Sequence, residues 1–232
     1  MTRFAGRGVD RRTVLELAGL VGLGVTSGLS GCLGAEPPSA AAKPALGPSD
    51  AVPDSAEAVI YTNLGAVFTD QGLRDGIDEQ IGTFQEQIEG SEGPSTLDEF
   101  LDDTEADTGI DLRGVTEGLG FWNPGMEDGA VVLSTAWSPE TITDQMSGYS
   151  AESYRGRTLY APPSGGPVAV LSDGVYAVGS DAAVRSVVDV RDGQADSLSG
   201  GLRDAYDGTR GMARFAVAVP DRSRSEERRV GK

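Results

Sequence analysis

The sequence predicts an α+β domain, a mostly antiparallel sheet with helices packed on one face. Three observations predict it. Short β-branched and aromatic runs follow one another across tight turns, as in antiparallel hairpins. Stretches with helix caps and a helical spacing of apolar residues lie between these runs. Hairpins and helices interleave along the chain without a residue-level repeat, which favours the α+β class.

The domain opens with a strand at residues 57–63, which are β-branched and aromatic. The stretch around Phe68 has no clear pattern. Asp70 can cap the next helix, whose apolar residues recur at helical spacing in one stripe: Leu73, Ile77, Ile81, Phe84 and Ile88. Ser95 and Asp98 resemble a capping box, which predicts a short helix just after them.

The middle of the domain reads as two strands, at residues 115–122 and 130–137, separated by a turn. Ser138 and Pro139 are typical of the N-cap and first position of a helix, which we expect to be short. Further strands are predicted at residues 157–161, 168–171 and 175–179.

The end of the domain reads as two helices and a strand. Asp181 can cap a helix that carries a valine stripe, and residues 202–206 form a further helical piece. Residues 212–219 predict a last strand. Because this strand stands near the end of the chain, the domain could be truncated at its C-terminus, the strand opening a second unit.

Composition excludes several classes of function. The chain has 232 residues, 19 basic and 36 acidic, with no histidine and one cysteine. It cannot by itself build a Ser-His-Asp triad, a His-ligated zinc site or an intramolecular disulfide. A formal charge of -17 makes nucleic acid an unsuitable partner, because both molecules are polyanions.

The acidic charge is concentrated in residues 44–220, which hold 30 acids and 9 bases, all of them arginine. Such a domain repels itself in dilute buffer. In molar salt the Debye length falls to about 3 Å and screens this repulsion. The composition therefore indicates adaptation to high salt, and the alternative is an ordinary acidic protein.

The N-terminus has the features of a signal peptide, predicted at residues 1–31. Its apolar run, residues 17–29, would rise roughly 20 Å as a helix, too short for a bilayer core of about 30 Å. Arg11 and Arg12 stand just before this run and resemble the twin-arginine export motif, although Glu16 departs from its usual pattern.

The apolar run ends in Leu29, Ser30, Gly31 and Cys32, which resembles a lipobox at all four positions. The resemblance implies cleavage before Cys32 and lipid on its thiol, which would hold the protein on the extracytoplasmic face of the cell membrane. Residues 32–53 are rich in Pro, Ala and Gly and predict a disordered tether. The acidic domain would then span residues 54–220.

These two motifs resemble those of haloarchaeal twin-arginine-exported lipoproteins of uncharacterised function, and the resemblance covers only the signal and lipobox region. The expected partners are the membrane, through the lipid on Cys32, and the twin-arginine export machinery. The basic tail, residues 221–232, resembles translated adapter or vector read-through; the alternative is a natural disordered tail.

The densest acidic cluster gives the only candidate metal ligands. Counted from Asp103, acids fall at positions 1, 3, 5 and 9 of a calcium loop, but glycine falls at position 7 instead of 6, and position 12 is Gly114 instead of glutamate. We therefore predict solvated acids and no cofactor, with weak divalent binding as the alternative. The weak candidates are Asp103, Glu105, Asp107 and Asp111.

Two further groups have a functional and a structural interpretation. Trp122, Trp137, Tyr154 and Tyr160 could form a ligand-binding face, but core and sheet positions are the stronger prediction. The basic run 155–157 could hold an anion, and pairing with nearby acids is the simpler account.

No pattern in the sequence specifies a reaction, so we predict no enzymatic activity. The leading hypothesis is a lipid-anchored binding or envelope-structural module adapted to high salt. The alternatives are a carboxylate-dependent extracellular hydrolase, which would need two acids facing one cleft, and a solute-binding lipoprotein.

Overall fold

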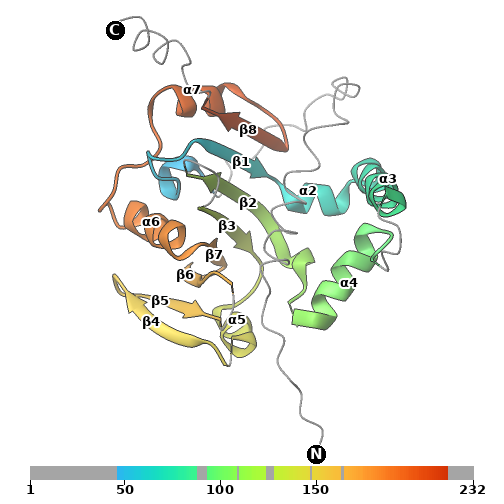
Figure 1. Cartoon of the computed structure of the whole chain (residues 1–232), viewed down its shortest axis with the longest axis horizontal. Helices are drawn as coiled ribbons and strands as arrows, with labels where there is room; N and C mark the ends of the chain where they lie inside the picture. Colours follow the sequence, from blue (N-terminus) through green and yellow to red (C-terminus); the bar gives the residue numbers. More distant parts are fainter. Residues whose placement is uncertain are drawn as a thin grey trace, which may run out of the picture.

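The computed structural model describes six stretches of the chain: residues 46–87, 93–108, 110–123, 128–146, 148–162 and 165–218 (Figure 1). The predicted export motif at Arg11 and Arg12, the lipobox, Cys32 and the C-terminal tail lie outside these residues. Within them, no helix combines the length and the hydropathy that a bilayer span requires.

The described residues form six α-helices, two short 3-10 helices and eight strands, which confirms the antiparallel α+β class. The helices are η1 (Pro48–Asp50), α2 (Leu64–Thr69), α3 (Gln71–Gln87), α4 (Leu97–Thr108), η2 (Leu112–Gly114), α5 (Pro139–Gln145), α6 (Asp181–Arg191) and α7 (Gly200–Gly208). The strands are β1 (Ala58–Thr62), β2 (Val115–Trp122), β3 (Gly129–Thr135), β4 (Ser150–Tyr154), β5 (Arg157–Ala161), β6 (Val168–Ser172), β7 (Val175–Gly179) and β8 (Ala213–Val217).

All eight strands belong to one sheet in the order β4-β5-β6-β7-β3-β2-β1-β8, and every neighbouring pair is antiparallel. Among the described residues, the last strand, β8, therefore pairs with the first one, β1. This pairing brings the two ends of the described chain together at one edge of the sheet (Figure 1).

Strand β4 has no counterpart in the sequence prediction. Its residues are polar and largely exposed, so they show no alternation of apolar and polar side chains. The strand forms because a two-residue turn folds it back onto β5. Arg155 and Gly156 have φ of 49° and 75°, and positive φ at both central positions is typical of the turns that match the twist of a hairpin.

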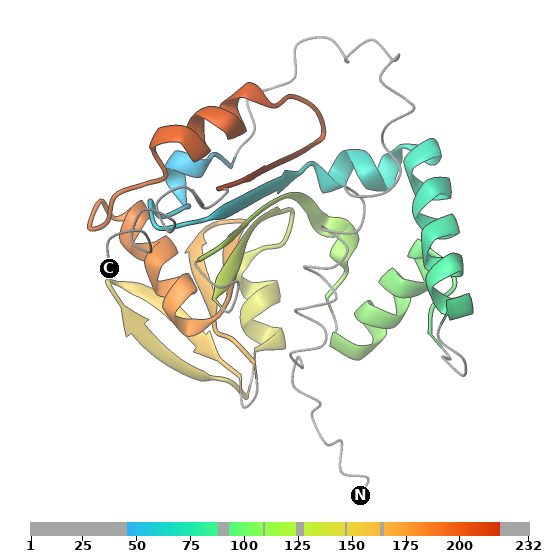
Figure 2. The same cartoon turned by 45° about the horizontal axis from the view of Figure 1, so that its top comes forward.

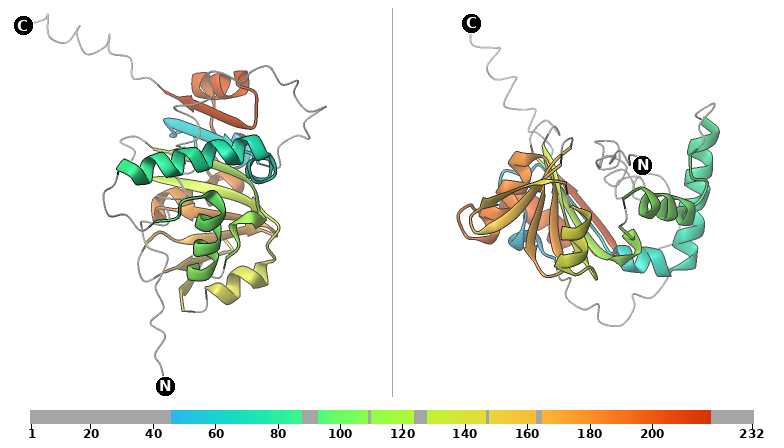
Figure 3. Two further views of the ribbon diagram at one scale, coloured as in Figure 1. Left: turned by 90° about the vertical axis from the view of Figure 1, so that its right-hand side faces the viewer. Right: turned by 90° about the horizontal axis from the view of Figure 1, so that it is seen from below.

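Helices lie against both faces of the sheet, whereas the sequence predicted one face. Val132 packs with the buried valines of α6, and the next residue, Leu133, packs with Leu97 and Leu101 of α4 on the opposite side. Adjacent strand residues point to opposite faces, so β3 serves two cores. Figure 3 shows α6 on one side of the sheet and α2, α3 and α4 on the other.

The folded domain begins earlier than the predicted boundary after Pro53. Leu46, Ala51 and Val52 are buried in the main core, and the Val52 carbonyl accepts a hydrogen bond from the Leu198 amide (2.8 Å). Pro53 forms an isolated β-bridge with Ser197. The composition suggested a tether because Pro and Gly are frequent there, but long-range contacts order residues 46–53. Figure 2 shows η1 against α7.

Candidate functional site

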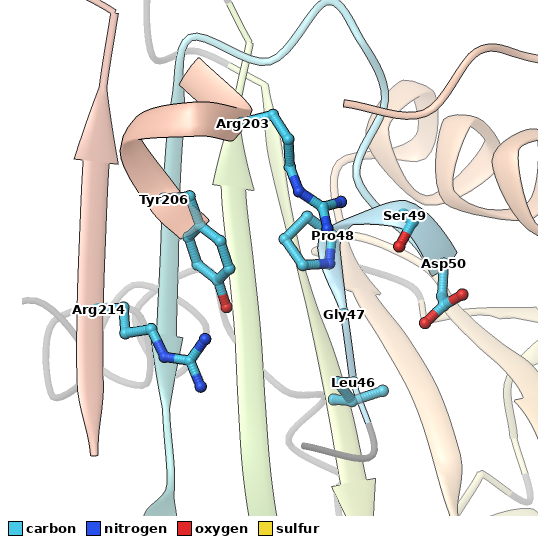
Figure 4. Close-up of a pocket in the computed structure, with 8 residues that line it drawn as sticks. All are labelled: Leu46, Gly47, Pro48, Ser49, Asp50, Arg203, Tyr206 and Arg214. Carbon is cyan, nitrogen blue, oxygen red and sulfur yellow. The ribbon is translucent and has the colours of Figure 1, made fainter. Parts of the chain in front are cut away.

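A pocket of about 260 Å³ lies where η1, α7 and β8 meet, at the β8 edge of the sheet (Figure 4). Its lining combines two arginines and a tyrosine from the C-terminal part of the domain with the first residues described in the structure. The lining residues are Leu46, Gly47, Pro48, Ser49, Asp50, Arg203, Tyr206 and Arg214.

Local structure explains why three of these side chains converge. Arg203 and Tyr206 are three residues apart on α7, so they project from the same side of the helix. Arg214 lies opposite Tyr61 in the β8–β1 ladder, and facing residues of a ladder share one face of the sheet. Figure 4 shows Arg203 and Tyr206 directed from α7 toward the segment of η1, with Arg214 reaching in from β8.

Arg214 is held by aromatic rings. Its guanidinium carbon lies 4.9 Å from the ring centre of Tyr61 and 5.5 Å from that of Tyr206. Among the described residues it makes no ion pair, whereas six other arginines do: Arg74, Arg113, Arg155, Arg157, Arg185 and Arg203. The pocket therefore holds a guanidinium fixed by stacking, with no described carboxylate bound to it.

Two buried polar atoms in this lining lack a partner within the described part of the chain: the Tyr206 hydroxyl and Arg214 Nε. Tyr206 is only 1% exposed. A buried donor without an acceptor costs about 1–3 kcal/mol, so both atoms call for an acceptor that the described residues do not supply.

The Glu117 carboxylate of β2 is already engaged beside the pocket. Glu117 accepts hydrogen bonds from the Leu46 amide and from the Tyr61 hydroxyl, each at 3.1 Å. Burial and the Glu117 charge both raise the pKa of Tyr61, so this phenol stays protonated as the donor. Glu117 thus anchors the start of the described chain beside the pocket.

The charges in the lining are of mixed sign. Arg203 Nε is 2.7 Å from Asp207 on the next turn of α7, and Asp50 is the one carboxylate that lines the pocket itself. Burial raises the pKa of Tyr206, while the nearby Arg214 charge opposes this rise. The lining does not provide the pair of catalytic acids that the hydrolase alternative would need.

Two of the predicted metal candidates, Glu105 and Asp111, lie beside the Arg113 guanidinium. Arg113 Nη2 is 2.7 Å from Asp102 Oδ1, and its Nη1 lies within 4.0 Å of Glu105 and Asp111. The hydrogen bond that the Arg113 guanidinium donates to Asp102 is the main cause that raises the pKa of Arg113. Among the described residues, no group of acids is arranged to hold a metal ion, and the Asp107 side chain lies outside them.

Asp103 is exposed on α4, and Asp111 caps η2 by accepting a hydrogen bond from the Arg113 amide (2.9 Å). Within this cluster, Asp111 therefore caps a helix and pairs with Arg113, and Glu105 pairs with Arg113.

Trp137, Tyr154, Arg155 and Arg157 make structural contacts in or beside the sheet. The Trp137 ring packs on Tyr176 at a centroid distance of 6.2 Å, and the Tyr154 hydroxyl donates to Asp189 (3.0 Å). Arg155 pairs with Asp189, and Arg157 pairs with Asp192. The basic residues of the run 155–157 therefore pair with nearby acids, as the simpler interpretation predicted.

Sequence reasoning did not single out Arg203, Tyr206 or Arg214. The only signal is weak: Arg214 lies in an acid-free stretch, residues 208–220, of a domain rich in acids. No local sequence pattern predicts that this stretch lies beside α7 and residues 46–50. The pocket therefore depends on contacts between the two ends of the domain.

No protein-family model matches the sequence, and no curated protein matches it. Among solved structures, crystal form III of TP0453 is similar with a TM-score of 0.43 and 14% identity, covering 75% of this chain and 64% of that chain. Crystal form I of TP0453 has a TM-score of 0.41 and 12% identity, covering 75% and 63%. The chain thus spans less than two thirds of the TP0453 chains that it matches.

Proposed function

We propose that this protein is a lipid-anchored binding module on the extracytoplasmic face of the membrane, adapted to high salt. The observation that carries the binding role is the pocket between η1, α7 and β8. It contains a fully buried tyrosine hydroxyl and an arginine Nε that have no acceptor among the described residues. Such groups are typical of a site that is completed by a ligand.

The anchoring role rests on the sequence. Arg11 and Arg12 precede an apolar run that ends in the lipobox 29–32. Lipid on Cys32 would attach the chain to the outer leaflet. Only 14 positions separate Cys32 from Leu46, which bounds the distance between lipid and pocket at about 50 Å of extended chain. The pocket would therefore act close to the membrane surface.

Lipid anchoring is tested by replacing Cys32 with Ser and fractionating cells of a host with twin-arginine export. We expect the wild-type protein with the membranes and the Cys32→Ser protein in the soluble extracytoplasmic fraction. Equal sedimentation of both proteins with membranes would contradict lipidation.

The export route is tested separately by replacing Arg11 and Arg12 together with lysine. The expected result is accumulation of uncleaved precursor inside the cell. Normal export of this variant would instead indicate the general secretory route.

The binding role is tested by native mass spectrometry on wild-type protein purified from its own membranes. We expect a fraction of the protein to carry a non-covalent small molecule, and we expect Tyr206→Phe to carry less of it. Protein that is always bare, in the wild type as in the variant, would refute the binding role and leave the anchoring result standing.

A further inference from the structure

We infer that the pocket between η1, α7 and β8 binds a small organic monocarboxylate, whose carboxylate faces Arg214 and Tyr206. This inference rests on the proposed binding role and specifies its ligand class. It follows from three properties of the lining: the excess of donors, the mixed charge and the small, partly apolar volume.

The unpartnered atoms require a ligand that accepts hydrogen bonds. Arg214 Nε is a donor only, and the Tyr206 hydroxyl can donate as well. A guanidinium presents its donors as a planar fork that matches the two oxygens of a carboxylate. The contacts with the Tyr61 and Tyr206 rings hold the guanidinium in place before the ligand arrives, which lowers the entropic cost of binding.

The surrounding charges favour one negative charge over two. Arg203 already pairs with Asp207, and Asp50 lines the pocket. Glu117 lies behind Tyr61, whose hydroxyl it binds at 3.1 Å. The charge of Arg214 is thus the one in this lining that no described carboxylate neutralises, so a monoanion balances it and a phosphate dianion would face repulsion.

The volume and the wall limit the body of the ligand. About 260 Å³ is below the roughly 300–1,000 Å³ of typical drug-sized sites. Leu46 and Pro48 form the apolar part of the wall, and Leu46 is 2% exposed. A short branched aliphatic acid fits these limits better than a polar or extended one.

The test is isothermal titration calorimetry of the full chain in sodium chloride at fixed concentration. The probes are sodium isobutyrate, its uncharged isostere isobutyramide, and sodium phosphate. We expect saturable binding of isobutyrate at one site, at least tenfold tighter than that of phosphate, and no measurable binding of isobutyramide. Equal binding of isobutyrate and isobutyramide, or tighter binding of phosphate, would overturn the inference.

Three variants locate the binding. Arg214→Gln should weaken isobutyrate binding tenfold or more, and Tyr206→Phe, which keeps the ring beneath Arg214, should weaken it severalfold. Arg210→Gln makes the same change of charge at an exposed residue outside the lining and should bind like the wild type. Circular dichroism checks that each variant is folded. If Arg214→Gln does not fold, the affinity of Tyr206→Phe for isobutyrate alone tests whether the ligand binds in this pocket.

Unchanged affinity in folded Tyr206→Phe and Arg214→Gln would place the binding elsewhere and refute the inference. The absence of any heat with all three probes would refute it too, because water alone would then fill the pocket. Retention of a different small molecule by membrane-purified protein would still support the proposed binding role, so the two failures are distinguishable.

Discussion

Gly114 shows how a single residue is constrained by a neighbour far along the chain. The Trp137 ring covers it and donates from Nε1 to the Asp111 carbonyl (3.0 Å). A Cβ at Gly114 would clash with Nε1 and would lie 2.8 Å from Cδ1 of that ring. An added methyl group therefore has to displace the indole and break its hydrogen bond.

We predict that Gly114→Ala lowers the free energy of unfolding by about 1–3 kcal/mol, the usual cost of overpacking. Urea denaturation in molar salt measures it. Gly76→Ala and Gly82→Ala are the matched controls, because a Cβ at either position of α3 meets nothing within 4 Å. They should be neutral or stabilising by up to about 1 kcal/mol, since alanine is the better helix former. A loss of unfolding free energy in Gly114→Ala no larger than in the two controls would contradict the close packing of Trp137 on Gly114.

Three buried tyrosines predict how stability depends on pH. Burial is the main cause that raises the pKa of Tyr61, Tyr176 and Tyr206 in the folded state. In the unfolded chain tyrosine ionises near pH 10 (about the model-peptide value). The contribution of these tyrosines to the free energy of unfolding is complete below that pH. It is lost as the pH rises above it, because only the unfolded chain then releases the phenol protons.

We therefore expect the denaturation midpoint to fall steeply above about pH 10. The chain has no histidine and only two lysines, so few other side chains titrate there. Tyr206→Phe should make the fall shallower, because it removes one of the three buried phenols. Phenolate absorbance should show the buried tyrosines ionising only on unfolding. A flat midpoint across this range would contradict their burial.

At the scale of elements, α6 and α2 contribute very differently to stability. In α6, Val184, Val187 and Val188 are fully buried against the sheet. In α2 no residue is fully buried, and Val67 is half-buried. Since apolar burial supplies most of the stability, α6 should anchor the domain more strongly than α2.

Val188→Ala should destabilise the protein by about 2 kcal/mol, from lost burial and the cavity left behind. Val67→Ala is the matched control, the same truncation within a helix, and should cost less than half as much. Equal costs, measured by urea denaturation in molar salt, would contradict this ranking of the two helices.

The elements that the sequence identified are those with a local signal. Helix α3 with the Ile77 and Ile81 part of its stripe, the Ser138 cap of α5 and the β6–β7 hairpin appear as predicted, while Ile88 lies outside the described residues. The cap of α4 is one residue off, because Thr96, not Ser95, accepts from the Glu99 amide (3.2 Å). Strand β4 was missed because its residues are polar. Helix α2 was missed because it depends on the Asn63 side chain, which caps it by accepting from the Ala66 amide (2.9 Å).

At the scale of the whole molecule, charge repulsion should decide how stability responds to salt. The chain carries a net charge of -17, and the ion pairs that Arg113, Arg185 and other arginines form neutralise only part of the acids. Raising sodium chloride from about 0.1 M to about 1 M shortens the Debye length from about 10 Å to about 3 Å. Screening of the many repulsions outweighs the weakening of these few exposed pairs.

We expect the melting temperature to rise steeply over that range of sodium chloride. Sucrose at matched osmolality is the control, because it favours burial but does not screen charge. Sucrose should raise the melting temperature much less. A flat response to salt, or equal responses to salt and sucrose, would contradict the electrostatic origin.

The candidate pocket lay beyond what the sequence could predict. Its arginines come from α7 and β8, and its opposite wall comes from residues 46–50, which composition had placed in a tether. Only the pairing of β8 with β1 brings Arg214 onto the Tyr61 ring. A sequence pattern reports neighbours within a few residues, whereas this site joins segments more than 150 residues apart.

By itself, the sequence determined the features that depend on composition and local spacing: the acidic surface charge, the caps, most strands and helices, and the antiparallel α+β class. The tertiary structure alone decided that helices cover both faces of the sheet. It also decided that Asp111 pairs with Arg113 and that Arg214 contacts two tyrosine rings in place of a described carboxylate. The physical reason is that charge and periodicity add up along the chain, while burial and pairing depend on which distant segments meet.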